Sequence, residues 1–237
     1  MQELINHINN SIEKAKNNQS NLSHEILSYD GMSSYKVRHL FNNLANHPSF
    51  KKYLEVGIYK GATSSAVIFN NNIEAILIDN WSQFSSDFNV TGTNNIFRDT
   101  KQQCLFNLNN AANKSRFKNI INVIDQDYST VDIGNEKIDL YFYDGEHSEI
   151  NQCNGIKQFY KNFSDVFMLV IDDFWSEQYD AGPGTLRCGA REGTRRAIKE
   201  LDLKILYDIH LEGYPADSLQ KKMETWWNGI YIALLQK

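Results

Sequence analysis

The chain has 237 residues, 41% of them hydrophobic and 22% charged, a mixture that excludes wholesale disorder. Its 24 basic and 29 acidic residues leave a formal net charge of −5, which argues against a dedicated nucleic-acid-binding protein with a basic face. Cys104, Cys153 and Cys188 form no CxxC pair, which argues against a disulfide framework or a structural zinc site and favours a reducing cytoplasm. Without a long apolar run or a signal-peptide core, the chain is expected to have no membrane partner.

The first 48 residues are predicted to be helical. Apolar residues recur at helical spacing over residues 1–20, and a turn is expected at 29–31. A second amphipathic helix is predicted over residues 36–47, and Pro48 marks its end. We therefore expect residues 1–48 to form an N-terminal helical cap.

From residue 49 onwards, short apolar runs that end in glycine or an acid alternate with helical segments. Continuous apolar runs are typical of strands that helices cover on both faces. The pattern predicts an α/β fold with a Rossmann-like doubly wound sheet, mostly parallel with an antiparallel C-terminal strand. This core would span residues 49–237 of a single domain, 1–237. The predicted strands are 53–57, 74–79, 119–124, 138–143, 167–171, 203–209 and 229–235, and the predicted helices between them include 62–69, 151–163 and 194–201.

A glycine turn follows the first predicted strand. Residues 55–61 read Glu-Val-Gly-Ile-Tyr-Lys-Gly, so Gly57 permits a tight turn and Gly61 lets the next helix pack near the strand. The turn lacks the second glycine of GxGxxG and the GK[ST] of a P-loop. Glu55 suits a cationic ammonium group better than a pyrophosphate. Taken alone, the turn is equally compatible with a purely structural strand–helix connection.

The end of the second predicted strand points to a nucleoside ligand. Asp79 lies 22 residues after Gly57, where a carboxylate can hold ribose hydroxyls. Together with Glu55, it suggests S-adenosylmethionine (SAM). Trp81 either flanks the adenine or belongs to the core, and Asp127 either contacts the adenine amino group or is a solvated loop acid. The residues expected to contact the cofactor are Glu55, Gly57, Tyr59, Gly61, Asp79, Asn80, Trp81, Asp127 and Asp144.

Three carboxylates follow the fourth and fifth predicted strands, at Asp144, Asp172 and Asp173. Neighbouring strand ends meet at one sheet edge, and like charges held close together are costly unless they are protonated or neutralised. Mg²⁺ or another hard divalent cation would neutralise them, so these three residues are the predicted metal ligands. One of the adjacent pair could instead point away and cap a helix.

His147 lies three residues after Asp144, one turn on if a helix begins there. It is either a general base or a helical residue without a chemical role, and we take Asp144 and His147 as the candidate catalytic residues. The glycine-rich stretch 180–193 is either a mobile lid or a plain surface loop. Its Arg187 and Arg191 either hold an anionic or sugar substrate or are solvated.

The ordered set of ExGxxxG, Asp79, DGEH and IDDFW resembles class I SAM-dependent methyltransferases. Within these, residues 32–237 most resemble the metal-dependent sugar O-methyltransferases of the macrocin and mycinamicin group. The resemblance implies that the three strand-end aspartates hold a metal and that His147 is the base, as in the mycinamicin branch. Asn80 and Trp81 depart from the usual Ser-Phe, and the polar N-terminal helix stands without the larger extra domain of some relatives.

These observations predict a SAM-dependent O-methyltransferase acting on a small-molecule or sugar hydroxyl, with SAM and Mg²⁺ as cofactors. It would be cytoplasmic, with no nucleic-acid or membrane partner, and compatible with a homo-oligomer. A metal-dependent hydroxylase of related fold and a non-catalytic SAM-binding protein remain alternatives. One histidine beside three acids disfavours an iron oxygenase, which usually uses two histidines and one carboxylate. The missing glycine disfavours an NAD-dependent oxidoreductase.

Overall fold

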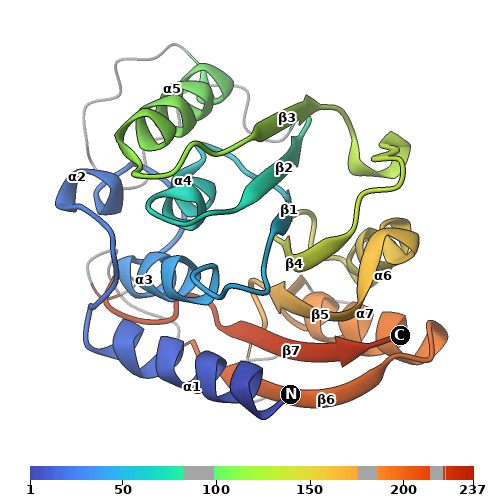
Figure 1. Cartoon of the computed structure of the whole chain (residues 1–237). Helices are drawn as coiled ribbons and strands as arrows, with labels where there is room; N and C mark the ends of the chain where they lie inside the picture. The colour runs from blue at the N-terminus through green and yellow to red at the C-terminus, as the bar shows by residue number, and fades with distance from the viewer. Residues whose placement is uncertain (83–98, 176–185, 214–220, 222) are drawn as a thin grey trace.

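The computed structural model describes residues 1–82, 99–175, 186–213, 221 and 223–237 (Figure 1). Within them, seven strands form one sheet in the order β3-β2-β1-β4-β5-β7-β6. The first five are parallel, and β7 runs antiparallel to both β5 and β6. The predicted fold class is therefore confirmed. The strands are β1 (Lys52–Val56), β2 (Glu74–Asp79), β3 (Ile121–Asp125), β4 (Ile138–Tyr143), β5 (Phe163–Ile171), β6 (Lys204–Leu211) and β7 (Ile230–Gln236).

Helices cover both faces of this sheet and bury two separate apolar cores, with α1 to α5 on one side and α6 and α7 on the other (Figure 1). The central strands are buried on both faces, which explains their continuous apolar runs. The helices are α1 (Gln2–Lys16), α2 (His24–Leu27), α3 (Tyr35–Leu44), α4 (Ala62–Ile68), α5 (Thr100–Lys114), α6 (Glu149–Gln158) and α7 (Leu186–Glu200), with 3₁₀ turns η1 (Tyr128–Thr130) and η2 (Tyr160–Asn162).

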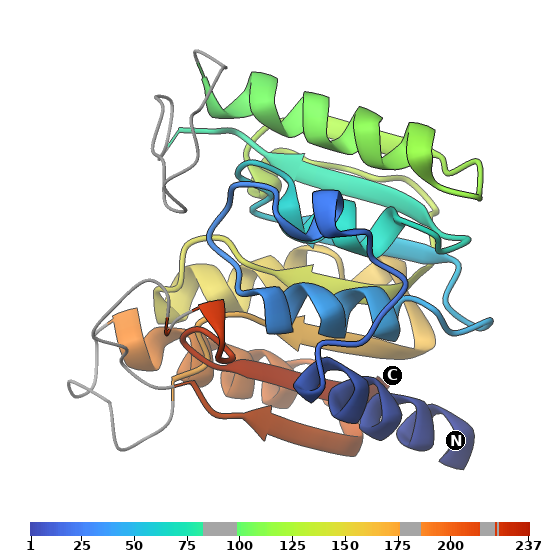
Figure 2. The same ribbon diagram turned by 90° about the vertical axis from the view of Figure 1, so that its left-hand side faces the viewer.

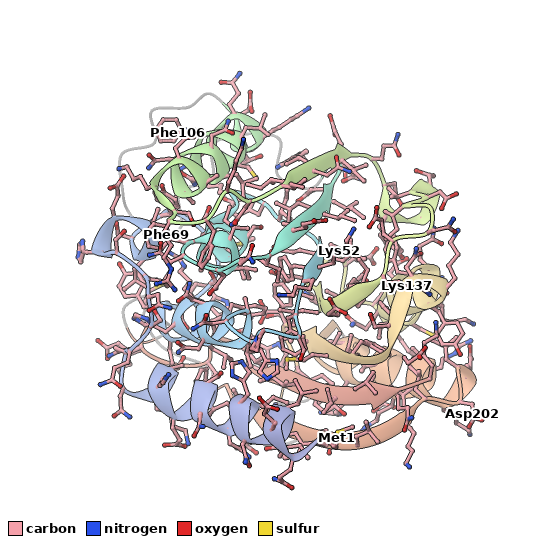
Figure 3. All side chains as sticks on the ribbon, viewed as in Figure 1. Met1, Lys52, Phe69, Phe106, Lys137 and Asp202 are labelled. Carbon is pink, nitrogen blue, oxygen red and sulfur yellow. The ribbon has the colours of Figure 1, made fainter. Side chains whose placement is uncertain are left out.

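Two helices that the apolar pattern did not predict are α2 and α5. A serine, Ser23, caps the four-residue α2, and Asp99 caps α5 by accepting from the Gln102 amide at 2.7 Å. α5 is rich in Asn and Gln, and its outer face carries Phe106, which is 49% exposed (Figure 3). The apolar residues of α5 therefore show little helical periodicity in the sequence. The Asp99 cap and the burial of the inner face are enough to form the helix. None of the described helices is long and apolar enough to span a bilayer.

The N-terminal helices pack directly on the sheet. α1 lies beside β6 in both ribbon views, and the Tyr207 hydroxyl donates to Asn9 Oδ1 at 2.7 Å (Figures 1 and 2). Ser34, the N-cap of α3, also donates its hydroxyl to the Thr225 carbonyl at 2.6 Å, near the start of β7. Segments almost 200 residues apart in sequence are thereby joined. The division into a cap at 1–48 and a core at 49–237 stays a prediction.

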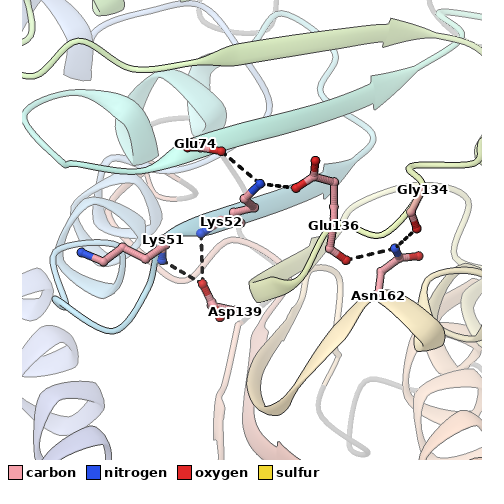
Figure 4. A network of polar contacts seen from close by, with 7 residues as sticks. All are labelled: Lys51, Lys52, Glu74, Gly134, Glu136, Asp139 and Asn162. Atoms are coloured by element: carbon pink, nitrogen blue, oxygen red, sulfur yellow. Dashed lines mark hydrogen bonds and ion pairs between the residues drawn. The ribbon is translucent and has the colours of Figure 1, made fainter.

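The amino-terminal ends of the central strands are closed by a polar network (Figure 4). The Lys52 ammonium bridges Glu136 and Glu74, and its Nζ lies 3.1 Å from the Glu74 carboxylate. Asp139 Oδ2 accepts from the backbone amides of Lys51 and Lys52 at 2.9 and 3.1 Å. These groups satisfy one another, so we look for chemistry at the opposite, carboxyl edge of the sheet.

Candidate active site

A cavity of about 1340 Å³ opens at the carboxyl ends of the parallel strands. Residues after five strands line it, together with two distant segments, Gly31–Ser33 and Trp227–Asn228. The volume exceeds that of a typical single-ligand pocket, about 300–1,000 Å³, so a cofactor and an acceptor can share it. The predicted site residues among its lining are Glu55, Gly57, Tyr59, Asp79, Asn80, Trp81, Asp127, Asp144, His147, Asp172 and Asp173.

The glycine turn connects β1 to α4 as predicted. Gly57 has a φ of 87°, and a side chain there would collide with the Asp144 backbone carbonyl. The close approach that requires this glycine is therefore to β4 and not only to a ligand. Gly61, with a φ of 72°, is the N-cap of α4 and lies against Cys104. It is not among the residues that line the cavity, so its predicted contact with the cofactor stays a prediction. Its close packing is against Cys104 and Leu108 of α5, and not against the strand as predicted.

Glu55 lies at the base of the turn, 1% exposed. Its Oε2 accepts from the Tyr53 hydroxyl at 2.9 Å and from the Ser64 hydroxyl at 2.5 Å. Loss of solvent on burial raises the pKa of Glu55 to about 8, and the two hydrogen bonds oppose this only in part. Glu55 therefore ionises less readily than an exposed glutamate, and a nearby cation would favour its ionised form.

Asp79 braces the glycine turn from the end of β2. Its Oδ2 accepts from the backbone amides of Ile58 and Tyr59 at 2.9 and 2.8 Å, and its Oδ1 accepts from the Trp81 amide at 2.7 Å. A carboxylate offers about four lone-pair sites, so Asp79 retains some capacity for a ligand hydroxyl. These bonds also hold Tyr59 at a φ of 48°, a left-handed conformation that non-glycine residues seldom adopt.

Trp81 and Asp127 flank the same side of the cavity. Trp81 is 7% exposed and donates its indole N–H to the Tyr59 carbonyl at 2.8 Å, so it belongs to the core and also lines the cavity. Asp127 caps η1, and hydrogen bonds from Ser129 lower the pKa of its carboxyl group. Its Oδ2 accepts from the Asn80 side-chain amide at 3.3 Å, so Asn80 and Asp127, both predicted to contact the cofactor, are hydrogen-bonded to each other.

Three acidic side chains converge at the ends of β4 and β5. Burial first, and then the charges of Asp173 and Glu55, raise the pKa of Asp144 well above its ordinary value. Burial and the charges of Asp144 and Asp173 do the same to Asp172, which is 4% exposed. Asp172 Oδ1 has no hydrogen-bond partner. Asp144 and Asp172 are thus short of positive charge, and Asp172 Oδ1 also lacks a donor.

His147 faces this acid group. Its Nε2 lies 3.5 Å from Asp144 Oδ1 and 3.6 Å from Asp173 Oδ2. The helix does not begin at Asp144, because Ser148 is the N-cap of α6 and His147 precedes it. A chain turn therefore places the ring beside Asp144, and its 13% exposed side chain remains open to the cavity.

The acid group was tested for a metal site. Among the described residues, no three or more His, Cys, Asp or Glu side chains are arranged so that they could hold a metal ion. The donors themselves are of the right kind, because hard divalent cations prefer carboxylate oxygens. The unpartnered Asp172 Oδ1 is one such oxygen. The donor chemistry fits Mg²⁺, whereas the side chains do not enclose a common point.

Sequence reasoning missed several groups that shape the site. Asn228 donates its side-chain amide to Asp173 Oδ1 at 2.6 Å and lines the cavity. The Lys60 ammonium lies 2.6 Å from Asp30 Oδ2 in a fully buried ion pair, which joins the glycine turn to the N-terminal segment. The fully buried Arg38 guanidinium donates to the Leu27 carbonyl at 2.7 Å and also to the Tyr29 carbonyl. The Asn-Gly pair before the last strand was the only local signal for any of them.

The predicted loop at 180–193 is wrong from residue 186 onwards, because α7 begins at Leu186. Residues 180–185 lie outside the described residues. Arg191 is 5% exposed and donates to the Trp175 carbonyl at 2.9 Å, so it is neither solvated nor part of the cavity lining. Gly189 and Gly193 serve close helix packing: a side chain at Gly189 would collide with the His147 carbonyl, and one at Gly193 with the Glu149 carbonyl.

No family model and no curated protein matches the sequence. Solved structures match the fold. The O-methyltransferase TomG from Streptomyces achromogenes, involved in tomaymycin synthesis and solved with SAM, matches with a TM-score of 0.56 and 16% identity, covering 96% of this chain and 90% of that one. An O-methyltransferase from Bacillus cereus, solved with SAH, matches with a TM-score of 0.55 and 12% identity, covering 96% of this chain and 91% of that one. The Podospora anserina methyltransferase PaMTH1, also solved with SAH, matches with a TM-score of 0.51 and 10% identity, covering 98% of this chain and 88% of that one.

At these identities the similarity shows the fold. The chain shares a Rossmann-like sheet with these solved methyltransferases, with five parallel strands and an antiparallel β7 inserted between β5 and β6. The narrower resemblance to the macrocin and mycinamicin group stays a prediction, as do the roles of the individual site residues.

Proposed function

We propose that this protein is a SAM-dependent O-methyltransferase that acts on a hydroxyl group of a small molecule or sugar. The observation that carries the proposal is that the glycine turn, the strand-end acids and His147 share one cavity. Support comes from the folds of O-methyltransferases that were solved with SAM or SAH. Because proteins of one fold can have different functions, the proposed reaction is inferred from the residues of the site.

The residues present fit SAM. Glu55 and the turn at Gly57 would face its methionine part, and the cationic ammonium group would favour the ionised form of Glu55. Asp79 would accept from a ribose hydroxyl with its remaining lone pair, while Trp81 and Asp127 would border the adenine. When bound, SAM supplies the methyl group. The chain's own contribution is to hold the acceptor oxygen in line with it.

We also propose that Asp144, Asp172 and Asp173 hold a divalent cation, with Mg²⁺ as the first candidate, once their side chains turn from the present arrangement toward a common point. Support comes from the raised pKa values of Asp144 and Asp172 and from the unpartnered Asp172 Oδ1. Such a cation, when bound, supplies positive charge that lowers the pKa of an acceptor hydroxyl. The Asn228 side-chain amide donates to Asp173 Oδ1, so the other oxygen of Asp173, Oδ2, faces His147.

His147 is the proposed general base. Its Nε2 points to the acids where an acceptor hydroxyl would lie, and an imidazole is the side chain best suited to take a proton near neutral pH. After the transfer, the Asp144 and Asp173 carboxyl groups would stabilise the imidazolium. Trp175 and Trp227 line the cavity and would supply apolar walls for a ring-shaped acceptor such as a sugar.

Calorimetric titration of the purified protein with SAM, NAD and Mg²⁺ tests the proposal. We expect SAM to bind and NAD not to bind; tight NAD binding without SAM binding would overturn it. SAM binding without turnover across a panel of hydroxyl acceptors would identify a non-catalytic binder. The Asp144→Ala variant is expected to lose methyl transfer. Asp125→Ala is its matched control, because Asp125 also ends a strand, pairs with Lys101 and does not line the cavity.

A further inference from the structure

A chain of buried polar groups reaches His147 from the side opposite the acids. His147 Nδ1 lies 3.4 Å from Gln152 Oε1, and the Gln152 side-chain amide donates to Thr194 Oγ1 at 3.3 Å. The Thr194 hydroxyl donates in turn to the Ala190 carbonyl at 2.7 Å. Gln152 is 0% and Thr194 1% exposed, so water does not compete for these bonds.

The close contact between α6 and α7 makes this chain of bonds possible. Gly189 lies against the His147 carbonyl, and Gly193 lies against the Glu149 carbonyl and the Gln152 side chain. Side chains at either glycine would push the helices apart and carry Thr194 away from Gln152. Gly189 and Gly193, which lie in the predicted lid or loop, are thus helical residues that allow the Thr194 hydroxyl to reach Gln152.

The direction of each hydrogen bond follows from the number of protons available. A hydroxyl carries one proton, and the short bond to the Ala190 carbonyl uses that of Thr194. Thr194 Oγ1 can therefore only accept from Gln152, so the Gln152 amide nitrogen faces it and the amide oxygen faces His147. A carbonyl oxygen only accepts hydrogen bonds. Nδ1 of His147 must then carry a hydrogen for the contact to be favourable.

From this geometry we propose that Gln152, oriented by Thr194, is a positioning residue that holds His147 as the Nδ1–H tautomer. The lone pair of the neutral ring then lies on Nε2, toward Asp144 and Asp173, whose carboxylate oxygens favour a hydrogen on Nε2 and so compete with Gln152. The tautomer itself is independent of the reaction, whereas its catalytic consequence rests on the proposed function. With the opposite tautomer, an N–H would face the acceptor and the ring could not take a proton there.

Nitrogen-15 NMR of the full-length protein, labelled at its six histidines, tests the proposal at a pH where the His147 ring is neutral. A spectrum of His147→Asn assigns the signal. Long-range proton–nitrogen correlations report which ring nitrogen carries the hydrogen, and in the wild type we expect Nδ1. Thr194→Val, which matches the shape without the hydroxyl, and Gln152→Leu should lose this preference. Thr194→Ser and Gln152→Glu, which keep the hydroxyl or the acceptor, should retain it.

An activity measurement separates the positioning role from a merely structural one. We expect Gln152→Leu to lower kcat for methyl transfer about tenfold or more, with SAM affinity unchanged and activity restored in Gln152→Glu; loss of a general base altogether typically costs about 10²–10⁴-fold. A wild-type ring with its hydrogen on Nε2, or a Gln152→Leu protein with unchanged tautomer, would overturn the proposal. If the wild type fails to bind SAM, the proposed function is lost while the tautomer result still stands.

Discussion

Replacing Glu55 by Gln should make the folded protein more stable at alkaline pH and leave it nearly unchanged at acidic pH. Glu55 is 1% exposed, and burial raises its pKa from the ordinary value of 4.5 to about 8. The amide oxygen of glutamine can still accept from Tyr53 and Ser64, and its amide nitrogen can face the cavity that Glu55 lines. The substitution therefore removes an ionisation without emptying the site.

The sign and size follow from proton linkage. Between these two pKa values the folded state binds more protons than the unfolded state, so the free energy of unfolding falls as the pH rises. The pKa values differ by about 3.5, and at about 1.36 kcal/mol for each pKa unit the complete effect is about 5 kcal/mol above pH 8. Between about pH 5 and pH 8 the wild type should lose about 3–4 kcal/mol through this one group.

Urea unfolding of both proteins at a series of pH values measures the effect. The difference in free energy of unfolding should grow with pH through this window. The shift of Asp172 largely cancels because both proteins contain it, whereas Asp144 loses the like charge of Glu55 and adds to the difference in the same direction. A difference that stays constant with pH would refute the reasoning, since it would mean that Glu55 ionises equally well in the folded protein. Glu74→Gln is the matched control, because that carboxylate is partly exposed and borders the opposite edge of the sheet.

Three other predictions concern the same edge of the sheet. Binding of SAM below about pH 8 should release a proton from Glu55, which calorimetry in buffers of different ionisation enthalpy detects and Glu55→Gln abolishes. Asp144→Asn should lower methyl transfer at least about 10²-fold, measured as SAH release, with an unchanged circular dichroism spectrum; full activity would exclude Asp144 from the chemistry. Lys60→Met removes the cation that faces buried Asp30 and should lower the free energy of unfolding by about 3–5 kcal/mol, measured with urea. Adding Asp30→Asn should restore most of this loss. A negligible loss would contradict the argument that the buried charges depend on each other.

Most of the fold was predictable because the sheet is covered on both faces. Strands buried in this way are continuous apolar runs that stop at the first polar residue, and the predicted bounds 74–79 and 138–143 agree with Glu74–Asp79 and Ile138–Tyr143. Strand β5 begins four residues earlier than predicted, at Phe163, because residues 164–166 are partly or fully exposed and interrupt the apolar run. The start of α7 was missed because glycines at a helix contact look like loop residues in a sequence.

Cavity-lining residues were easiest to predict where they end or directly follow a strand. Asp79, Asp144 and Asp172 are of this kind, since the sheet itself carries their side chains to one edge. Asn228 and Gln152 act through contacts that depend on how a distant turn or helix packs. The Asn228-Gly229 pair marks a turn, but nothing in either local sequence marks the contact itself.

The buried acids connect the stability of the protein to its proposed chemistry. Glu55 is one of the charges that raise the pKa of Asp144, and Asp144 in turn raises that of Asp172, so the three groups form one electrostatic unit across the cavity. A cation that neutralises Glu55 makes ionisation of Asp144 easier, and a cation at Asp144 does the same for Glu55. If the proposed ligands bind there, a methionine-type ammonium at the turn and a divalent cation at the aspartates would by linkage favour each other's binding by equal amounts. On the proposed function, the excess of carboxylates at this edge would therefore disfavour the free protein and favour the loaded one on the same electrostatic grounds.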